Sequence, residues 1–192
     1  MDPVALDSLA IASTRLRVAG LREGHLSRPT VNAGWDVRTL VAHLVGGCQL
    51  YAGVLRGQTV DWAARNSQPI ADPLGQFDAA AAELAEAIGE LDDRRRPVTI
   101  PAGDIPAAAA IAIHATDMLV HGWDLAVATG QDRRLDPDLC ATATAIISQF
   151  PASTWGNPKF YADPVRTDSA DPADQLAAFT GRDPQHHFDG AR

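Results

Sequence analysis

The stretch that decides the fold is IPAAAAIAIHATDMLVHGWDLAVA, residues 105–128. It is apolar around almost its whole circumference, as expected of a helix buried inside a bundle. Four ionisable side chains interrupt it at steps of three, four and three residues: His114, Asp117, His121 and Asp124. With about 3.6 residues per turn, these steps place all four on one stripe of the helix. Because a buried ionisable group costs free energy unless it has a partner, the stripe predicts a metal ion, a hydrogen-bond network or a lined pocket.

The composition is that of one globular domain followed by a tail. The 192 residues are 46% hydrophobic and 21% charged, which is enough for one good core. We expect a helical bundle over residues 1–151 and an irregular C-terminal extension over residues 152–192, packed on the bundle and mobile at its end. The formal net charge of −8 argues against binding to nucleic acid or to anionic membrane surfaces.

No sequence signal for secretion or for a membrane is present. The N-terminal segment MDPVALDSLA lacks a basic region followed by an apolar run, so no signal peptide is predicted. The longest uncharged apolar run, residues 105–116, is too short to span a bilayer. Cys48 and Cys140 lie far apart in apolar helical contexts, which favours two buried free thiols. A cytoplasmic location is therefore expected, with the oligomeric state open between a monomer and a homodimer.

Hydrophobic periodicity predicts a mainly helical chain. The expected helices cover residues 4–22, 36–55, 73–93, 105–130 and 137–150, with a short one at 173–180. Asp104 is the expected cap of the buried helix, and residues 98–100 are expected to form a short extended piece. Because strand signals are few, the predicted fold class is all-α: an up-down four-helix bundle with an extra helix and an irregular C-terminal tail.

A metal site in a helical bundle needs ligands from more than one helix. Asp117 and His121 are four residues apart and supply half of such a site. The segment DVRTLVAHLVGG on the second helix offers His43, followed by Gly46 and Gly47, which lack bulk and would let a neighbouring helix come close. His43 is therefore the best candidate to complete a set of two histidines and one aspartate with an open coordination position.

Zinc fits imidazole and carboxylate ligands, and nickel or iron would fit as well. His114 and Asp124 are candidates to orient the ligands, or one of them to act as a fourth ligand. Trp123, beside the stripe, is a candidate wall of a pocket, although a tryptophan in a buried helix more often belongs to the core. Trp35 is expected to be a packing anchor at the end of the bundle.

A purely structural interpretation of the same residues stands beside the metal site. A buried histidine such as His43 is usually a core residue that hydrogen-bonds to a backbone carbonyl. Asp117 and His121 could pair with each other, or with Arg38 or Arg56. Spacing on a helix alone does not decide between these alternatives.

Three segments resemble a known family. GWDVRTLVAHLVGG (residues 34–47) and ATDMLVHGWDLAVATGQD (residues 115–132) resemble the metal-binding domain of the mycothiol-dependent maleylpyruvate isomerase family, within the DinB-like bundle superfamily. The ending DQLAAFTGRDP (residues 174–184) resembles the tail of an actinobacterial branch of that group. The resemblance implies a DinB-like bundle of four main helices with a divalent metal held by three residues.

In the family pattern the metal ligands are a histidine in the AHLVGG segment, then an acidic residue and a histidine four residues apart. These positions fall on His43, Asp117 and His121. The family usually has glutamate at the acidic position, so the shorter Asp117 is expected to hold the metal more weakly or through a water. His114 lies close enough on the stripe to substitute for it.

The resemblance also implies a thiol cofactor, mycothiol or a similar low-molecular-weight thiol, and a small-molecule electrophile as partner. Asp124 or His114 would orient a ligand or move a proton, and Trp123 would be the cofactor-binding residue. The tail looks too short for the additional C-terminal domain of the maleylpyruvate isomerase itself, so a thiol S-transferase is favoured over that isomerisation. The alternative is a bundle protein that binds a metal or a small ligand without turnover.

Overall fold

The computed structural model describes residues 1–101, 103–150 and 161–185. This part of the chain is mostly helical, with one small antiparallel sheet. In chain order the elements are α1 (Pro3–Ala19), η1 (Glu23–His25), α2 (Val37–Leu55), η2 (Trp62–Ala64), α3 (Pro73–Gly89), β1 (Pro97–Ile100), β2 (Gly103–Pro106), α4 (Ala107–Thr129), α5 (Pro137–Ile147) and α6 (Pro172–Phe179). The predicted mobile end of the tail lies outside the described residues.

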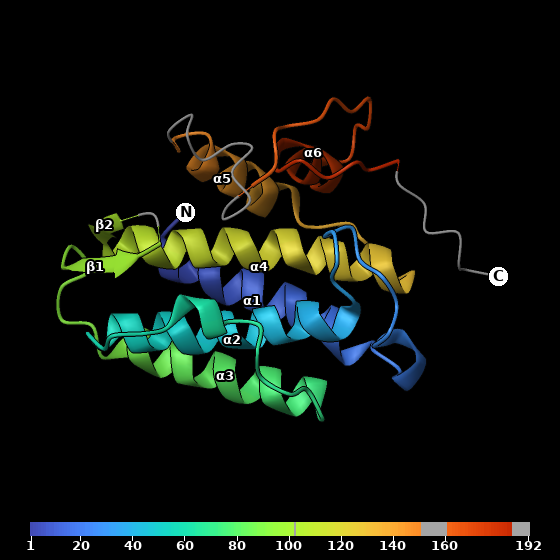
Figure 1. Ribbon diagram of the computed structural model, residues 1–192. Coiled ribbons are helices and arrows are strands. Elements are labelled where there is room, and N and C mark those ends of the chain that lie inside the picture. The colour runs from blue at the N-terminus through green and yellow to red at the C-terminus, as the bar shows by residue number, and fades with distance from the viewer. Residues whose placement is uncertain (102, 151–160, 186–192) are drawn as a thin grey trace.

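The four long helices α1 to α4 lie side by side (Figure 1). Helix α1 packs against α4 and α3, and α2 packs against α3 and α4. Helices α5 and α6 contact each other and the side of α4 that the other long helices leave open. The mostly helical character of the predicted all-α fold is therefore confirmed, but β1 and β2 form a small sheet that the all-α prediction did not include. Among the helices of the described residues, none is long and apolar enough to cross a membrane.

An aspartate followed by proline begins most of these helices. The aspartate side chain accepts hydrogen bonds from the first free backbone N–H groups, and the proline that follows has the φ angle a helix needs without adding an unpaired N–H. The pairs are Asp2–Pro3, Asp72–Pro73, Asp136–Pro137 and Asp171–Pro172. Helix α2 uses the cap alone, because the Asp36 side chain accepts from the Thr39 N–H at 2.8 Å.

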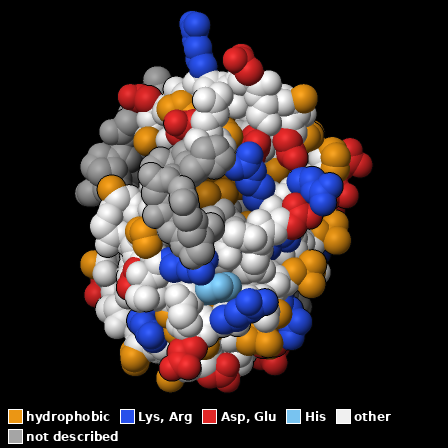
Figure 2. Space-filling model, turned by 90° about the vertical axis from the view of Figure 1, so that its right-hand side faces the viewer, with side chains coloured by type: hydrophobic (Ala, Val, Ile, Leu, Met, Phe, Trp, Pro, Cys, Tyr) orange, Lys and Arg blue, Asp and Glu red, His pale blue; other side chains and the backbone are white. Residues whose placement is uncertain are grey.

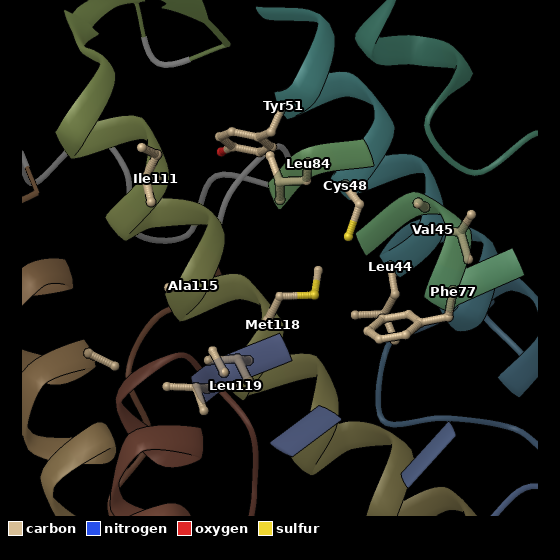
Figure 3. Close-up of a cluster of buried hydrophobic side chains, with 14 of the residues drawn as sticks. Leu44, Val45, Cys48, Tyr51, Phe77, Leu84, Ile111, Ala115, Met118 and Leu119 are labelled. Atoms are coloured by element: carbon tan, nitrogen blue, oxygen red, sulfur yellow. The ribbon is translucent and has the colours of Figure 1, made fainter. Parts of the chain in front are cut away.

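The core fills the space between α2, α3 and α4 (Figure 3). Its labelled members are Leu44, Val45, Cys48 and Tyr51 of α2, Phe77 and Leu84 of α3, and Ile111, Ala115, Met118 and Leu119 of α4. Full burial of a side chain of the size of leucine or phenylalanine contributes roughly 1.5–3 kcal/mol. This packing sets the distance between α2 and α4, the two helices that supply the predicted metal ligands.

The start of α4 differs from the prediction. Residues 97–106 form the β1–β2 hairpin, and α4 begins at Ala107. Asp104 lies in β2 and accepts a 2.6 Å hydrogen bond from the Thr99 hydroxyl. The expectation that Asp104 caps the helix was therefore wrong, because strand pairing takes its side chain across to β1. The end of α4 follows the usual rule, with Gly130 in the left-handed conformation at φ 71°.

The end of the molecule shown in Figure 2 carries a mixed surface. Basic, acidic and hydrophobic side chains of the described residues lie beside one another there in small groups. On this face, basic side chains lie around a histidine, with acidic side chains close by.

Candidate metal centre

His43, Asp117 and His121 converge at the interface of α2 and α4. One ligand atom from each residue lies within 4.8 Å of the other two. Asp117 Oδ2 is 3.5 Å from His43 Nε2, and Asp117 Oδ1 is 3.4 Å from His121 Nε2. The shorter aspartate thus still reaches both imidazoles, and the structure brings together the three residues chosen from the sequence.

These separations are longer than ordinary hydrogen bonds. Two ligands about 2.0–2.1 Å from a tetrahedral zinc ion lie about 3.3–3.4 Å apart. The spacing between the Asp117 carboxylate and each imidazole is close to that value, at 3.5 Å for His43 and 3.4 Å for His121. The donor set therefore fits a divalent ion in its chemistry, and the three ligand atoms lie within 4.8 Å of one another.

Hydrogen bonds on the far side of each imidazole turn Nε2 toward the group. His43 Nδ1 lies 2.8 Å from Asn66 Oδ1, and His121 Nδ1 lies 2.8 Å from Asp124 Oδ2. Because both partner oxygens can only accept, each Nδ1 carries a proton. Nε2 of His43 is buried and has no hydrogen-bond partner among the described residues. This nitrogen is therefore free to bind a metal, although His25 Nδ1 and His114 Nε2 are also buried without a partner among the described residues and lie outside the group.

The local charges favour the metal-binding forms of His43 and Asp117, whereas they favour the protonated form of His121. Burial, followed by the nearby Arg65 guanidinium, lowers the pKa of His43 to about 4, so its imidazole is neutral at pH 7. Burial alone would raise the pKa of Asp117, but Arg65 and His121 hold it well below its usual range. Burial likewise opposes protonation of His121, but Asp117 and Asp124 raise its pKa. Asp117 is therefore a carboxylate, as metal binding requires.

Asp117 has an arginine partner that the sequence analysis did not name. The guanidinium Nη2 of Arg65, the residue after η2, contacts Asp117 Oδ2 directly. Of the arginines considered from the sequence, Arg38 donates to the Ile70 carbonyl and Arg56 pairs with glutamates of α3 and its cap. Pairing of Asp117 with an arginine was thus a correct alternative, but both arginines proposed for it were wrong.

The two glycines of α2 make room for this arginine. A Cβ at Gly46 would lie 2.0 Å from the Arg65 carbonyl oxygen, and one at Gly47 would lie 2.5 Å from Arg65 Nη2. The expectation that Gly46 and Gly47 admit a neighbouring helix was therefore wrong, because the close neighbour is the loop that carries Arg65. The same loop supplies Asn66 to His43.

Asp124 is buried behind His121 in a polar network. It accepts hydrogen bonds from Arg182 Nη2 at 3.0 Å and from Asn32 Nδ2 at 2.9 Å, besides its contact with His121. Burial would raise the pKa of Asp124, but the Arg182 charge and the contact with His121 lower it. Asp124 thus lies behind His121, where its expected orienting role remains a prediction, and its partners Arg182 and Asn32 were not expected from the sequence.

Asp124→Asn is expected to lower zinc affinity about 10–100-fold, as is usual when a partner behind a histidine ligand is changed. The amide keeps the size of the carboxylate but loses the charge that fixes the proton on His121 Nδ1. Competition with a chromophoric chelator measures the affinity, and circular dichroism checks the fold. Asp132→Asn, on the exposed loop after α4, is the matched control. Equal affinities for both variants and the unchanged chain would refute an orienting role for Asp124.

Trp35, and not Trp123, is the aromatic ring at the site. The Trp35 ring centroid lies 4.8 Å from that of His43 and 6.0 Å from that of His121. Trp123 points to the other side of α4, where its Nε1 donates to Asp174 in the first turn of α6 at 3.0 Å. Trp123 follows His121 by two residues, about 200° around the helix, which turns it away from the ligands. The placement of Trp123 beside the predicted cofactor was therefore wrong.

His114 lies apart from the other three residues of the stripe. Its Nδ1 is 2.6 Å from Asp7 Oδ1 of α1, and both residues are buried. Burial opposes protonation, but the Asp7 charge prevails and raises the pKa of His114 to about 10. His114 is therefore one member of an ion pair between α1 and α4, and it does not stand in for Asp117 among the candidate ligands.

One further buried residue belongs to the surroundings of the site. Tyr161 is 8% exposed, and burial together with the Asp117 charge raises its pKa. It lies in the segment after α5, where the sequence has little periodicity. Neither a motif nor a regular spacing could have placed it beside the ligands.

The fold and the site define a class: a helical-bundle protein with a buried candidate metal centre of two histidines and one aspartate. The sequence profile described as the Mycothiol maleylpyruvate isomerase N-terminal domain matches residues 8–126. The chain belongs to that family. The candidate ligands His43, Asp117 and His121 all fall inside the matched region.

Relatives over the full length are known as well. Uncharacterized proteins of two Mycobacterium tuberculosis strains are each 34% identical over 188 residues, which cover 95% of this chain and 98% of each relative. The crystal structure of the mycothiol-dependent maleylpyruvate isomerase superposes with a TM-score of 0.69 at 17% identity, covering 95% of this chain and 89% of that chain. A histidine-to-alanine mutant of that isomerase gives a TM-score of 0.67 at 16% identity, with 91% and 85% covered. At this identity the likeness shows a shared fold.

The extent of the superposition on the isomerase corrects the expectation that this chain lacks a separate domain of that enzyme. Since 89% of the isomerase chain superposes on this one, the idea that a separate C-terminal domain sets the isomerase apart is not supported. The fold thus gives no reason to prefer S-transfer over isomerisation.

Proposed function

We propose that this chain binds a divalent metal through His43, Asp117 and His121 and uses it to activate mycothiol or a similar low-molecular-weight thiol. The observation that best supports this proposal is the convergence of three metal-ligand atoms within 4.8 Å at the packed interface of two helices. Zinc is the metal we propose, and nickel or iron would suit the same donors. A low-molecular-weight thiol as cosubstrate is in keeping with a cytoplasmic location.

A bound divalent ion would lower the pKa of a coordinated thiol, so that a thiolate is available at neutral pH. The residues of this chain have separate tasks around it. Asn66 and Asp124 hold the protons on Nδ1 of His43 and His121 and so direct Nε2 to the site. Trp35 covers both imidazole rings and limits the access of water.

The thiolate sulfur would form a bond to an electrophilic carbon of a small molecule. If a leaving group departs with the bonding electrons, the result is S-transfer. If the sulfur adds to an activated double bond, the bond can rotate before the sulfur leaves again, and the result is cis–trans isomerisation. We propose a thiol S-transferase or isomerase, and the two are separated by the product formed.

The test is thiol-dependent turnover by zinc-loaded protein. We expect the protein to consume maleylpyruvate or a haloaromatic electrophile when mycothiol is present, and His121→Ala to reduce the rate to the uncatalysed background. Free cysteine in place of mycothiol shows whether the thiol is recognised or only activated. Rates equal to background with the unchanged, zinc-loaded protein would contradict an activity on these compounds.

A separate observation supports a second candidate function. Arg65 already neutralises Asp117, which favours a bundle that binds a small ligand or a metal without turnover. Metal analysis of the purified protein is the test: no bound divalent metal, with stability unaffected by added zinc, would exclude metal binding with or without turnover and leave a bundle that binds a small ligand.

A further inference from the structure

Arg65 forms an ion pair with Asp117, whose carboxylate would have to bind the metal. Its guanidinium contacts Asp117 Oδ2, the same oxygen that lies 3.5 Å from His43 Nε2. The side chains of Arg65 and Asp117 are only 16% and 15% exposed. A charged pair this far from water interacts more strongly than one on the surface.

The position of Arg65 is built into the fold. Its Nε donates to the His43 carbonyl at 3.2 Å, so the guanidinium is held at the backbone of a candidate ligand as well as at Asp117. Gly46 and Gly47 leave the space that its backbone and side chain fill. Arg65 is therefore not a mobile surface side chain that meets Asp117 by chance.

The charges at the site indicate how Arg65 would affect metal binding. A divalent ion held by His43, Asp117 and His121 would bring two positive charges next to the guanidinium at Asp117. The ion and Arg65 would share one carboxylate, and like charges repel strongly where water is scarce.

We propose that Arg65 is a built-in competitor of the metal: it serves as the counter-ion of Asp117 in the metal-free protein and weakens metal binding. This inference rests on the proposed metal centre. It also gives a reason for the metal-free protein to stay folded, since the largely covered Asp117 carboxylate keeps a charged partner without the metal. A role as an outer partner that orients Asp117 would have the opposite effect, because loss of such a partner weakens metal binding.

Replacing Arg65 should raise the metal affinity if Arg65 is a competitor and lower it if Arg65 orients Asp117. We expect Arg65→Met to bind zinc more tightly by roughly 5–150-fold, the usual range for coupling between two ligands of one protein. Chelator competition measures zinc, and the absorption bands of bound cobalt report the coordination. Without metal, Arg65→Met should melt at a lower temperature than the unchanged protein, and zinc should raise its melting temperature more.

Two further variants control for the loss of a positive charge elsewhere and for the loss of a hydrogen-bond donor at Asp117. Arg56→Met removes one positive charge at the far end of α2, 13 residues from His43 in the sequence, or about 20 Å along the helix. It should leave the zinc affinity unchanged. Arg65→Gln keeps an amide that can donate to Asp117 but removes the charge. It should bind zinc more tightly than the unchanged protein even if Arg65→Met does not fold.

The outcomes separate this inference from the proposed function. Tighter zinc binding by either Arg65 variant than by Arg56→Met supports competition. Equal or weaker binding by the Arg65 variants overturns competition while the metal centre stands. If neither the unchanged protein nor any variant binds zinc or cobalt, the proposed metal centre fails and this inference fails with it.

Discussion

Zinc affinity is expected to fall by more than about 100-fold when His43 or His121 is replaced by alanine, because loss of a ligand exceeds the roughly 10–100-fold effect of losing an outer partner. Each imidazole presents Nε2 to the group, and no other described histidine lies in it. Isothermal titration and chelator competition measure the affinity. Circular dichroism separates loss of metal from loss of fold.

The matched control for these two variants is His25→Ala. His25 lies in η1, outside the candidate ligand group. Its replacement should leave the zinc affinity within about twofold of the unchanged protein, as expected for a site that shares no partner with the ligands. Zinc binding that survives in both His43→Ala and His121→Ala would place the metal elsewhere.

Asp7→Asn is expected to lower the free energy of unfolding by about 3–5 kcal/mol at pH 7, the usual cost of breaking a buried ion pair. Asp7 and His114 are 2% and 0% exposed, and the pair lies between α1 and α4. Without the carboxylate, burial would disfavour the charged imidazole. Urea unfolding measures the change.

The same pair predicts a pH dependence. The pKa of His114 is raised in the folded protein to about 10 from 6.5, so the folded state binds more protons than the unfolded state between these values. Its contribution to stability is complete below pH 6.5 and is lost as the pH rises toward 10. In Asp7→Asn this decline should disappear. There the neutral imidazole should instead make the protein less stable as the pH falls through the pKa of the unfolded state.

Asp78→Asn is the control for the ion pair. Asp78 pairs with Arg15 at 2.7 Å on the surface, where both side chains are largely exposed. Such pairs contribute about 0–1 kcal/mol. If Asp7→Asn costs no more than Asp78→Asn, the pair of Asp7 and His114 does not hold α1 to α4.

Much of the fold could be predicted because short local sequence signals mark where the helices begin and end. The Asp–Pro pairs mark four helix starts, and Gly130 marks the end of α4. The extended piece predicted at residues 98–100 is confirmed as part of β1, but β2 and its pairing with β1 were not predicted. The two strands are four residues each, too short for alternation to stand out, and strand pairing with Thr99 overrode the capping preference of Asp104.

The candidate ligands could be predicted because helical spacing is fixed. Asp117, His121 and Asp124 stay on the same face of α4 whichever helix packs against it. The AHLVGG segment identified His43 as the candidate on the second helix. His114 fits the same stripe but lies about two turns from His121, and α1 meets it there with Asp7. The spacing could not reveal which helix would face each turn.

The rest of the site comes from segments without periodicity. Arg65 and Asn66 lie in the loop after η2, and Arg182 follows α6, so only the tertiary structure brings them to the ligands. Gly46 and Gly47 did signal a close approach, but a missing side chain does not say whether a helix or a loop fills the space.

Zinc-soaked crystals, examined by anomalous diffraction at the zinc absorption edge, test the central claim most directly. We expect one strong peak about 2.0–2.2 Å from Nε2 of both His43 and His121, with a carboxylate oxygen of Asp117 as the third protein ligand. A zinc peak at another place, with Arg65 still on Asp117 and no density between the two imidazoles, would contradict it.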